Sequence, residues 1–153
     1  MKKKKLSAED YEKREKFLLK NTAVGTDEAH ILKKDLEVRQ QAFLKGEYSI
    51  SYFNGLTAAY AEELIKKGWM DAKDTQNDSP TNREMVDFCA SNPSFTMHGY
   101  VLPPGRPDTR ISLEGVGVKD GARPGREEVE NFAEMFRHAD EFDMGPCYRA
   151  WYD

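Results

Sequence analysis

The clearest pattern along the chain is an alternation of apolar and polar residues on both sides of a turn-forming segment, over residues 94–118. The segment in the middle, 103–108, reads P-P-G-R-P-D. A period of two is typical of strands that bury one face, and Pro, Gly and Asp are the residues that form turns. The pattern therefore predicts a β-hairpin.

The segments before the hairpin have helical period, with apolar residues three and four positions apart. Capping residues precede each segment, and a glycine, or an Asn-Pro pair, follows most of them. The expected helices run from Ser7 to about Asn21, from Thr26 or Asp27 to about Lys45, from Ser49 or Asn54 to Lys67, and from Ser79 to Asn92. The first of them has a thin apolar stripe and many charges, so we expect it on the outside of the molecule.

Two more elements are expected after the hairpin. Apolar residues recur at i, i+3, i+4 and i+7 from Val129 to Phe136, which predicts a helix from Arg126 to about Ala139. The aromatic tail 147–152 has the composition of a strand, and we place it beside the hairpin. Phe132 and Phe136 are expected to pack on the apolar face of the hairpin together with Leu113.

These elements predict an α+β fold in one domain, residues 1–153, with a flexible basic tail at 1–6. The helical part is expected at about 7–91. The hairpin, the packing helix and the C-terminal strand are expected at about 94–153, where they form a small three-stranded antiparallel sheet.

Composition narrows the class of protein. Apolar residues make up 39% and charged residues 33% of the chain, and no apolar run approaches the length of a membrane helix. Polar residues follow Lys2–Lys5, so this start is not read as a secretory signal. The two cysteines, Cys89 and Cys147, are far apart and match no pairing motif. A cytoplasmic protein without membrane contact is expected.

Charge argues against tight nucleic-acid binding. The net charge is −4, and the clearest excess of positive charge lies in the first 20 residues. A nucleic-acid binder concentrates positive charge on its contacting surface. Any binding to DNA is therefore expected to be weak, salt-sensitive and dependent on Lys2–Lys5.

Alternation along the hairpin divides its side chains between two faces. Met97 and Leu113 belong to the apolar face, which should meet the helices. The polar face carries Thr96, His98, Tyr100, Arg110, Ser112 and Glu114, and Arg149 and Trp151 can join it from the tail.

This polar face is the candidate site. An aromatic ring can stack on a ligand, and an arginine can bind a carboxylate or a phosphate. An exposed His98 would titrate near neutrality, with Glu114 orienting it. Arg106 at the hairpin tip is a further binding candidate. Two other outcomes are open: an ordinary solvent face with cross-strand ion pairs, or a buried polar network beneath the N-terminal helices.

Catalytic and metal signatures are missing from the sequence. It contains no G-x-S-x-G, no phosphate-binding loop and no metal-ligand spacing. We therefore expect no cofactor, and a noncatalytic module that binds a protein or a small molecule through the open sheet face or through the Pro-rich hairpin loop 103–108. One alternative is a winged-helix nucleic-acid binder that reads DNA with residues 80–90 and has Arg106 at the wing tip. Another is a small enzyme with His98 and Glu114 as an acid–base pair.

Overall fold

A computed structural model of the chain describes residues 6–25, 50–104, 106–145 and 148–153. The helix predicted from Thr26 or Asp27 to Lys45 lies outside the described residues, as do Lys2–Lys5 and Cys147. The described elements, in chain order, are α1 (Ala8–Asn21), β1 (Ala23–Gly25), β2 (Ser51–Leu56), α3 (Ala58–Lys66), α4 (Asn82–Ser91), β3 (Phe95–Leu102), β4 (Arg110–Val118), α5 (Arg126–Phe136), β5 (Glu141–Met144) and β6 (Tyr148–Trp151).

The strands form one antiparallel sheet in the order β1-β2-β3-β4-β6-β5. The α+β class, the hairpin β3–β4 and the tail strand β6 beside it are confirmed. The predicted three-stranded sheet is wrong, because six strands pair in the described part of the chain. Of the three added strands, β1 and β5 have only three and four residues, too few for a period to stand out.

The predicted start of the third helix, at Ser49 or Asn54, is wrong. Residues 51–56 form a strand that pairs with β1 on one side and β3 on the other. The helix α3 begins only after Thr57, whose hydroxyl accepts a hydrogen bond from the Tyr60 amide. Its end is as predicted: Gly68 has φ +72°, and the Trp69 amide donates to the Leu64 carbonyl.

Capping also explains the bounds of the other helices. Ser7 caps α1 as predicted, since its hydroxyl accepts from the Asp10 amide. α4 begins after Thr81 and not after Ser79. Thr81 and Glu84 form a capping box that satisfies two helix-end amides, whereas the Ser79 hydroxyl accepts from the Gln76 amide in the preceding loop. α5 ends at Phe136, short of the predicted Ala139.

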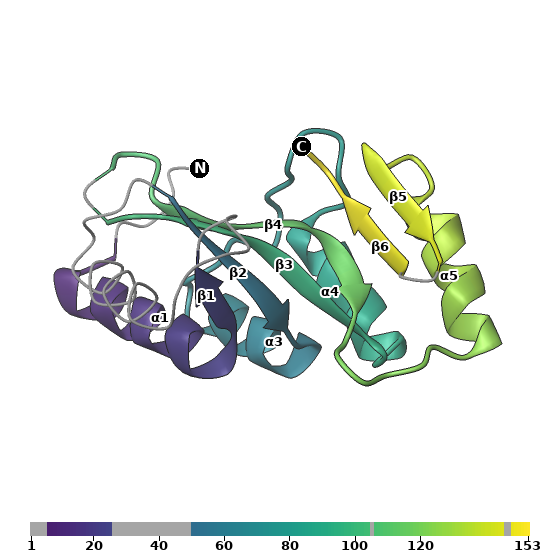
Figure 1. The fold of residues 1–153 in the computed structure, drawn as a ribbon. Helices are drawn as coiled ribbons and strands as arrows, with labels where there is room; N and C mark the ends of the chain where they lie inside the picture. The colour runs from purple at the N-terminus through teal and green to yellow at the C-terminus, as the bar shows by residue number, and fades with distance from the viewer. Residues whose placement is uncertain (1–5, 26–49, 105, 146–147) are drawn as a thin grey trace.

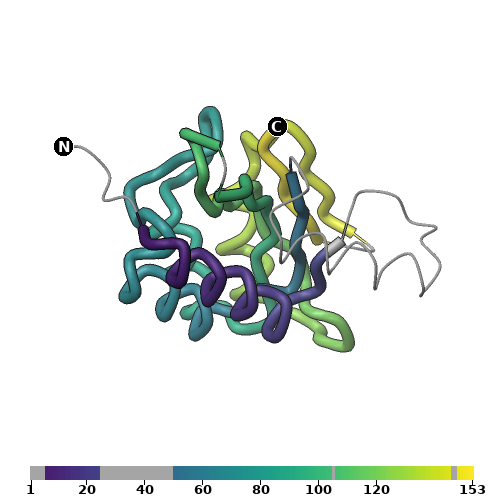
Figure 2. Tube along the Cα trace, turned by 90° about the vertical axis from the view of Figure 1, so that its left-hand side faces the viewer, coloured from purple at the N-terminus to yellow at the C-terminus, as the bar shows by residue number. Residues whose placement is uncertain are grey.

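The described helices lie on one side of the sheet (Figures 1 and 2). Phe132 of α5 stacks on Phe95 of β3 at 5.1 Å, and Phe136 meets Phe88 of α4 edge to face at 4.9 Å. The predicted packing of Phe132 on the hairpin is confirmed, whereas Phe136 contacts rings of α4, of α5 itself and of the C-terminal tail. Leu113 is fully buried in the same core.

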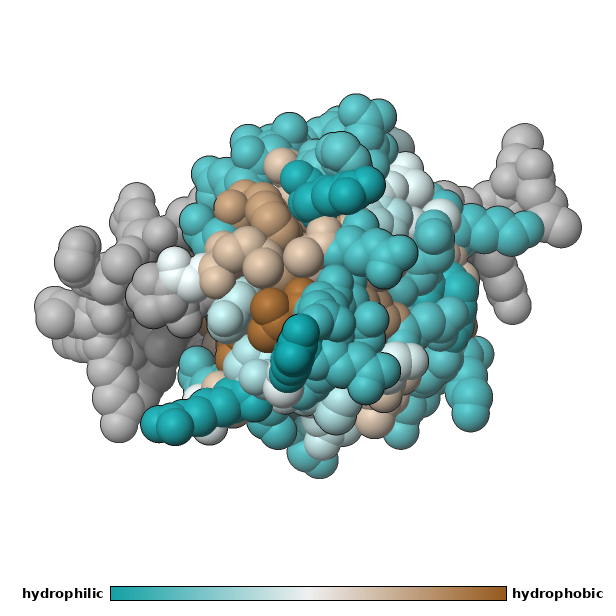
Figure 3. Space-filling view, turned by 90° about the vertical axis from the view of Figure 1, so that its right-hand side faces the viewer, coloured by the Kyte–Doolittle hydropathy of each residue, from teal (hydrophilic) through white to brown (hydrophobic). Residues whose placement is uncertain are grey.

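Figure 3 shows the end of the molecule at α5 and β5, where an apolar area is surrounded by hydrophilic residues. Met135, Phe142 and Tyr148 are partly buried there against the core.

None of the described helices is both long enough and apolar enough to cross a membrane.

α1 is more buried than its sequence predicts. Arg14 and Glu15 are 1% and 2% exposed. The Arg14 guanidinium donates to the Leu102 carbonyl at 3.3 Å and to the Thr109 hydroxyl at 3.1 Å. The helix is therefore held to the end of the hairpin by a charged residue and not only by its thin apolar stripe.

Candidate functional site

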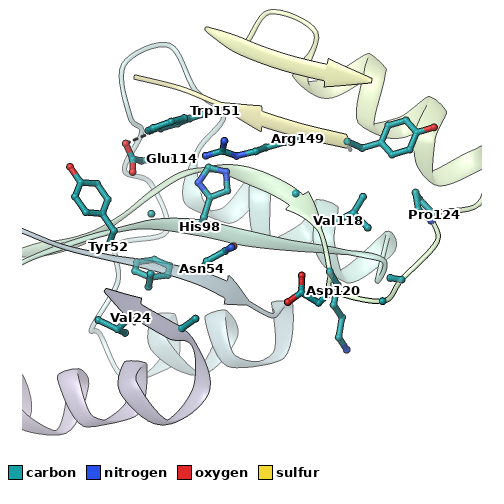
Figure 4. A pocket seen from close by; sticks show the side chains of 18 of the residues that line it. Val24, Tyr52, Asn54, His98, Glu114, Val118, Asp120, Pro124, Arg149 and Trp151 are labelled. Atoms are coloured by element: carbon teal, nitrogen blue, oxygen red, sulfur yellow. Dashed lines mark hydrogen bonds between the residues drawn. The ribbon is translucent and has the colours of Figure 1, made fainter. Parts of the chain in front are cut away.

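A groove of about 910 Å³ opens on the polar face of the sheet. Its side chains include Tyr52, Asn54, His98, Glu114, Arg149 and Trp151, and the segment 117–124 forms one end (Figure 4). Ligand pockets have volumes of about 300–1,000 Å³. The groove therefore has the size of a small-molecule site.

A bulge in the hairpin positions Glu114. His98 lies opposite Gly115 and Gly99 lies opposite Leu113, so Glu114 is the extra residue of β4. Glu114 is 7% exposed, and one of its carboxylate oxygens accepts a hydrogen bond from the indole Nε1 of Trp151 at 3.1 Å. Glu114 was expected to orient His98. Its observed partner is Trp151, and this hydrogen bond fixes the plane of the indole.

His98 of β3 lines the groove. Its Nε2 lies 3.2 Å from the Ala150 carbonyl of β6, which can only accept, so Nε2 donates and Nδ1 is left as the acceptor. Burial, together with the charge of Arg149, lowers the pKa of His98 to about 4. The imidazole is therefore neutral at physiological pH, because the ring does not have the exposure on which the expected titration near neutrality depended.

Arg149 reaches into the groove from β6 (Figure 4). Its guanidinium lies 4.7 Å from the ring centre of Trp151, in a cation–π contact. Within the described parts of the chain, Arg149 has neither an ion pair nor a hydrogen-bond partner. The result is an exposed arginine whose guanidinium is held by an indole that is itself held by Glu114.

The other predicted site residues lie elsewhere. The Tyr100 hydroxyl donates to the side-chain oxygen of Gln76 at 2.8 Å and accepts from the Arg110 guanidinium at 3.0 Å. Gln76 belongs to the loop between α3 and α4, so this loop contacts the polar face of the sheet here. Tyr100 and Arg110 therefore take part in a hydrogen-bond network within the protein. Arg106 pairs with Asp108 at the hairpin tip, 2.9 Å apart. Of the residues that the sequence assigned to the site, four line the groove: His98, Glu114, Arg149 and Trp151.

Several groove residues were missed from the sequence. Tyr52 and Asn54 lie in or at the start of the helix predicted from Ser49 or Asn54, although the glycine at position 55 weakens a helix. Lys119 and Arg123 follow the hairpin in a turn and belong to no motif. No local signal could have placed them in the groove.

The helix suggested for reading DNA packs against the core. Met85 and Phe88 of α4 are buried, while Glu84 and Asp87 are exposed. Arg83 pairs with Glu62 and Asp87. The outer surface of α4 thus presents carboxylates where a DNA-reading helix needs positive charge.

Metal ligands are not gathered in the described residues, where no three His, Cys, Asp or Glu side chains lie together. Cys89 is buried, which raises the pKa of its thiol to about 12 and keeps it protonated.

Comparisons with known protein families, with characterised proteins and with solved structures gave no match to this chain. The case for a function therefore depends on the groove alone.

Gly115 of β4 lies in close contact with β6, its neighbour in the sheet. A Cβ atom at this position would lie 1.9 Å from the Ala150 carbonyl oxygen and 3.0 Å from Nε2 of His98. We expect Gly115→Ala to push β6 away and to lower the free energy of unfolding by about 1–3 kcal/mol. A chemical denaturation curve measures this loss.

Gly117→Ala is the matched control for Gly115→Ala, because the nearest atoms to a Cβ at Gly117 lie 3.8 Å away. Equal stability of the two variants would contradict the close approach of β6.

Proposed function

We propose that the protein is a noncatalytic binding module that takes a small organic anion with an aromatic ring into the sheet groove. The observation that carries this proposal is Arg149, which lies on the Trp151 ring and is unpaired within the described residues. A guanidinium presents a planar fork of N–H donors that matches a carboxylate or a phosphate.

The contacts around Arg149 reduce the conformational entropy that its side chain would lose when a ligand binds. Glu114 fixes Trp151 through the Nε1 hydrogen bond, and the indole holds the guanidinium through its face. A side chain already held in its binding geometry loses less conformational entropy when a ligand arrives. Tyr52 of β2 adds a second aromatic ring to the groove wall, so the ligand's own ring has apolar surface to contact.

The environment of His98 favours binding over acid–base catalysis. A general base works best when its pKa is close to the working pH, whereas burial lowers the pKa of His98 to about 4. Nε2 of His98 is engaged by Ala150, and Glu114 holds Trp151. The remaining acceptor, Nδ1, suits the recognition of an N–H or O–H group on the ligand.

The test uses the two tryptophans, Trp69 and Trp151, as reporters. In the ¹⁵N-labelled protein, each indole N–H gives its own NMR signal, and Trp151→Phe assigns them. Titration with 1-naphthoate should shift the Trp151 signal and leave that of Trp69, which is 9% exposed and contacts Phe17 of α1.

Arg149→Gln should weaken 1-naphthoate binding about tenfold or more, because a charge-assisted hydrogen bond contributes about 1.5–3 kcal/mol. Arg137→Gln is the matched control, since Arg137 is exposed at the end of α5 and does not line the groove. The neutral 1-naphthamide should also bind more weakly. Equal binding of the acid and the amide, or an unchanged affinity in Arg149→Gln, would refute the proposal.

A further inference from the structure

Positive charge enters the groove from two separate elements. Arg149 comes from β6, and Lys119 and Arg123 come from the segment that follows β4. In the described parts of the chain, neither Lys119 nor Arg123 forms an ion pair or a side-chain hydrogen bond. Among the described residues, the groove lining has three cationic side chains and two carboxylates, Glu114 and Asp120, although the whole chain has a net charge of −4. A single carboxylate on the ligand would need only Arg149.

We propose that the ligand is a free nucleotide, with its phosphate between Arg149 and the Lys119–Arg123 segment and its base toward Tyr52 and Trp151. This inference depends on the function proposed above and names the ligand class for the same groove. A phosphate carries a charge of about −1.5 to −2 at pH 7 and offers three acceptor oxygens, so it can use donors from two elements at once.

The labelled side chains mark two ends of the groove. Tyr52, Glu114, Trp151 and the guanidinium of Arg149 lie toward one end, and Asp120 and Pro124 lie toward the other (Figure 4). In the proposed arrangement the phosphate lies on the side of Arg149 that faces residues 119–123. A volume of about 910 Å³ leaves room for a ring, a sugar and a phosphate in line. Any of the nucleobases can stack on an aromatic side chain, since every base has a π face.

Polar groups near the middle of the groove suit the edge of a base. Asn54 of β2 carries both donors and an acceptor, and Nδ1 of His98 is an acceptor. A base edge likewise combines N–H donors with ring nitrogen and carbonyl acceptors. A plain aromatic acid has no such ring donors and acceptors with which Asn54 and His98 could form hydrogen bonds.

The nearest helix end does not supply the phosphate contacts. Glu128 of α5 accepts from the Gly125 amide at 3.1 Å and from the Ser94 amide at 3.0 Å, so the N-terminus of α5 is capped by its own carboxylate. The phosphate must then be bound by side chains. Its affinity should depend on Lys119 and Arg123 and fall as salt is added.

The experiment is calorimetric titration with the four ribonucleoside 5′-monophosphates, the matching nucleosides and inorganic phosphate. At least one monophosphate should bind about tenfold more tightly than its nucleoside and than phosphate alone. The variant Lys119→Gln/Arg123→Gln should lose about tenfold in affinity for that nucleotide while its binding of 1-naphthoate is retained. The matched control, Lys73→Gln/Arg137→Gln, removes two exposed charges outside the groove lining and should bind like the unaltered protein.

The outcomes separate the two proposals. If 1-naphthoate binds through Arg149 but no monophosphate exceeds its nucleoside, only the nucleotide assignment is overturned. If no aromatic anion binds, the proposed function fails as well. A single-stranded hexanucleotide that binds more than tenfold tighter than every mononucleotide would overturn the assignment to a free nucleotide. A thermal melt of each variant shows that lost binding is not lost folding.

Discussion

Replacing Phe132 with alanine is expected to lower the free energy of unfolding by about 3–5 kcal/mol. Phe132 is fully buried and stacks on Phe95 at 5.1 Å and on Phe142 at 5.2 Å. It also meets Tyr148 edge to face at 6.3 Å. This one ring therefore joins α5 to β3, β5 and β6, and truncating it leaves a cavity among aromatic rings that cannot close over the space.

Urea denaturation followed by circular dichroism measures the loss caused by Phe132→Ala. Glu134→Ala, on the exposed side of the same helix, is the matched control and should change stability by no more than about 0.5 kcal/mol. A loss below about 1 kcal/mol for Phe132→Ala would mean that α5 does not pack as described.

Replacing Glu15 with glutamine is expected to stabilise the protein at alkaline pH. Glu15 is 2% exposed, and one of its carboxylate oxygens has no hydrogen-bond partner. Burial raises the pKa of Glu15 from 4.5 to about 7, against the opposing attraction of Arg14. The folded state thus favours the protonated carboxyl, which glutamine imitates.

The sign of the pH effect follows from proton linkage. Between pH 4.5 and about 7, the folded protein holds a proton on Glu15 that the unfolded chain has released. The contribution of Glu15 to stability is therefore complete below pH 4.5 and is lost as the pH rises through about 7. Relative to the unaltered protein, Glu15→Gln should gain stability across this window, reaching about 3 kcal/mol at pH 8.

The measurement is the difference in unfolding free energy between Glu15→Gln and the unaltered protein at pH 4.5, 6 and 8. His98 acts in the opposite direction, because its lowered pKa makes stability fall as the pH drops from 6.5 to about 4. Its contribution is common to both proteins and cancels in the difference. Glu12→Gln, an exposed neighbour on α1, should show no such gain. A difference that is constant with pH would contradict the burial of Glu15 as a proton-binding group.

Local patterns in the sequence predicted the elements whose own residues carry the signal. The hairpin alternates over 95–102 and 110–118 around a segment rich in Pro, Gly and Asp, which favour turns. α5 repeats its phenylalanines with helical spacing, and Ser7 is a hydrogen-bonding cap. In each case, the information lies within a few residues of the element it specifies. The α+β class and the candidate face with His98, Glu114 and Trp151 follow from these elements.

Tertiary structure decided what depends on residues far apart in the sequence. Residues 51–56 carry no clear period of their own, and pairing with β1 and β3 selects the strand that brings Tyr52 into the groove. The bulge at Glu114 arises from the register with β3, which turns this carboxylate to Trp151.

The pKa of His98 likewise depends on β6 lying over the ring, about fifty residues away in the chain. The sequence by itself determined which segments form helices or strands where the pattern is strong, because that choice is made by local backbone and side-chain preferences. It did not determine the strand order, the register or the grouping of Lys119, Arg123 and Arg149, because those depend on contacts between distant segments that form only when the whole core packs.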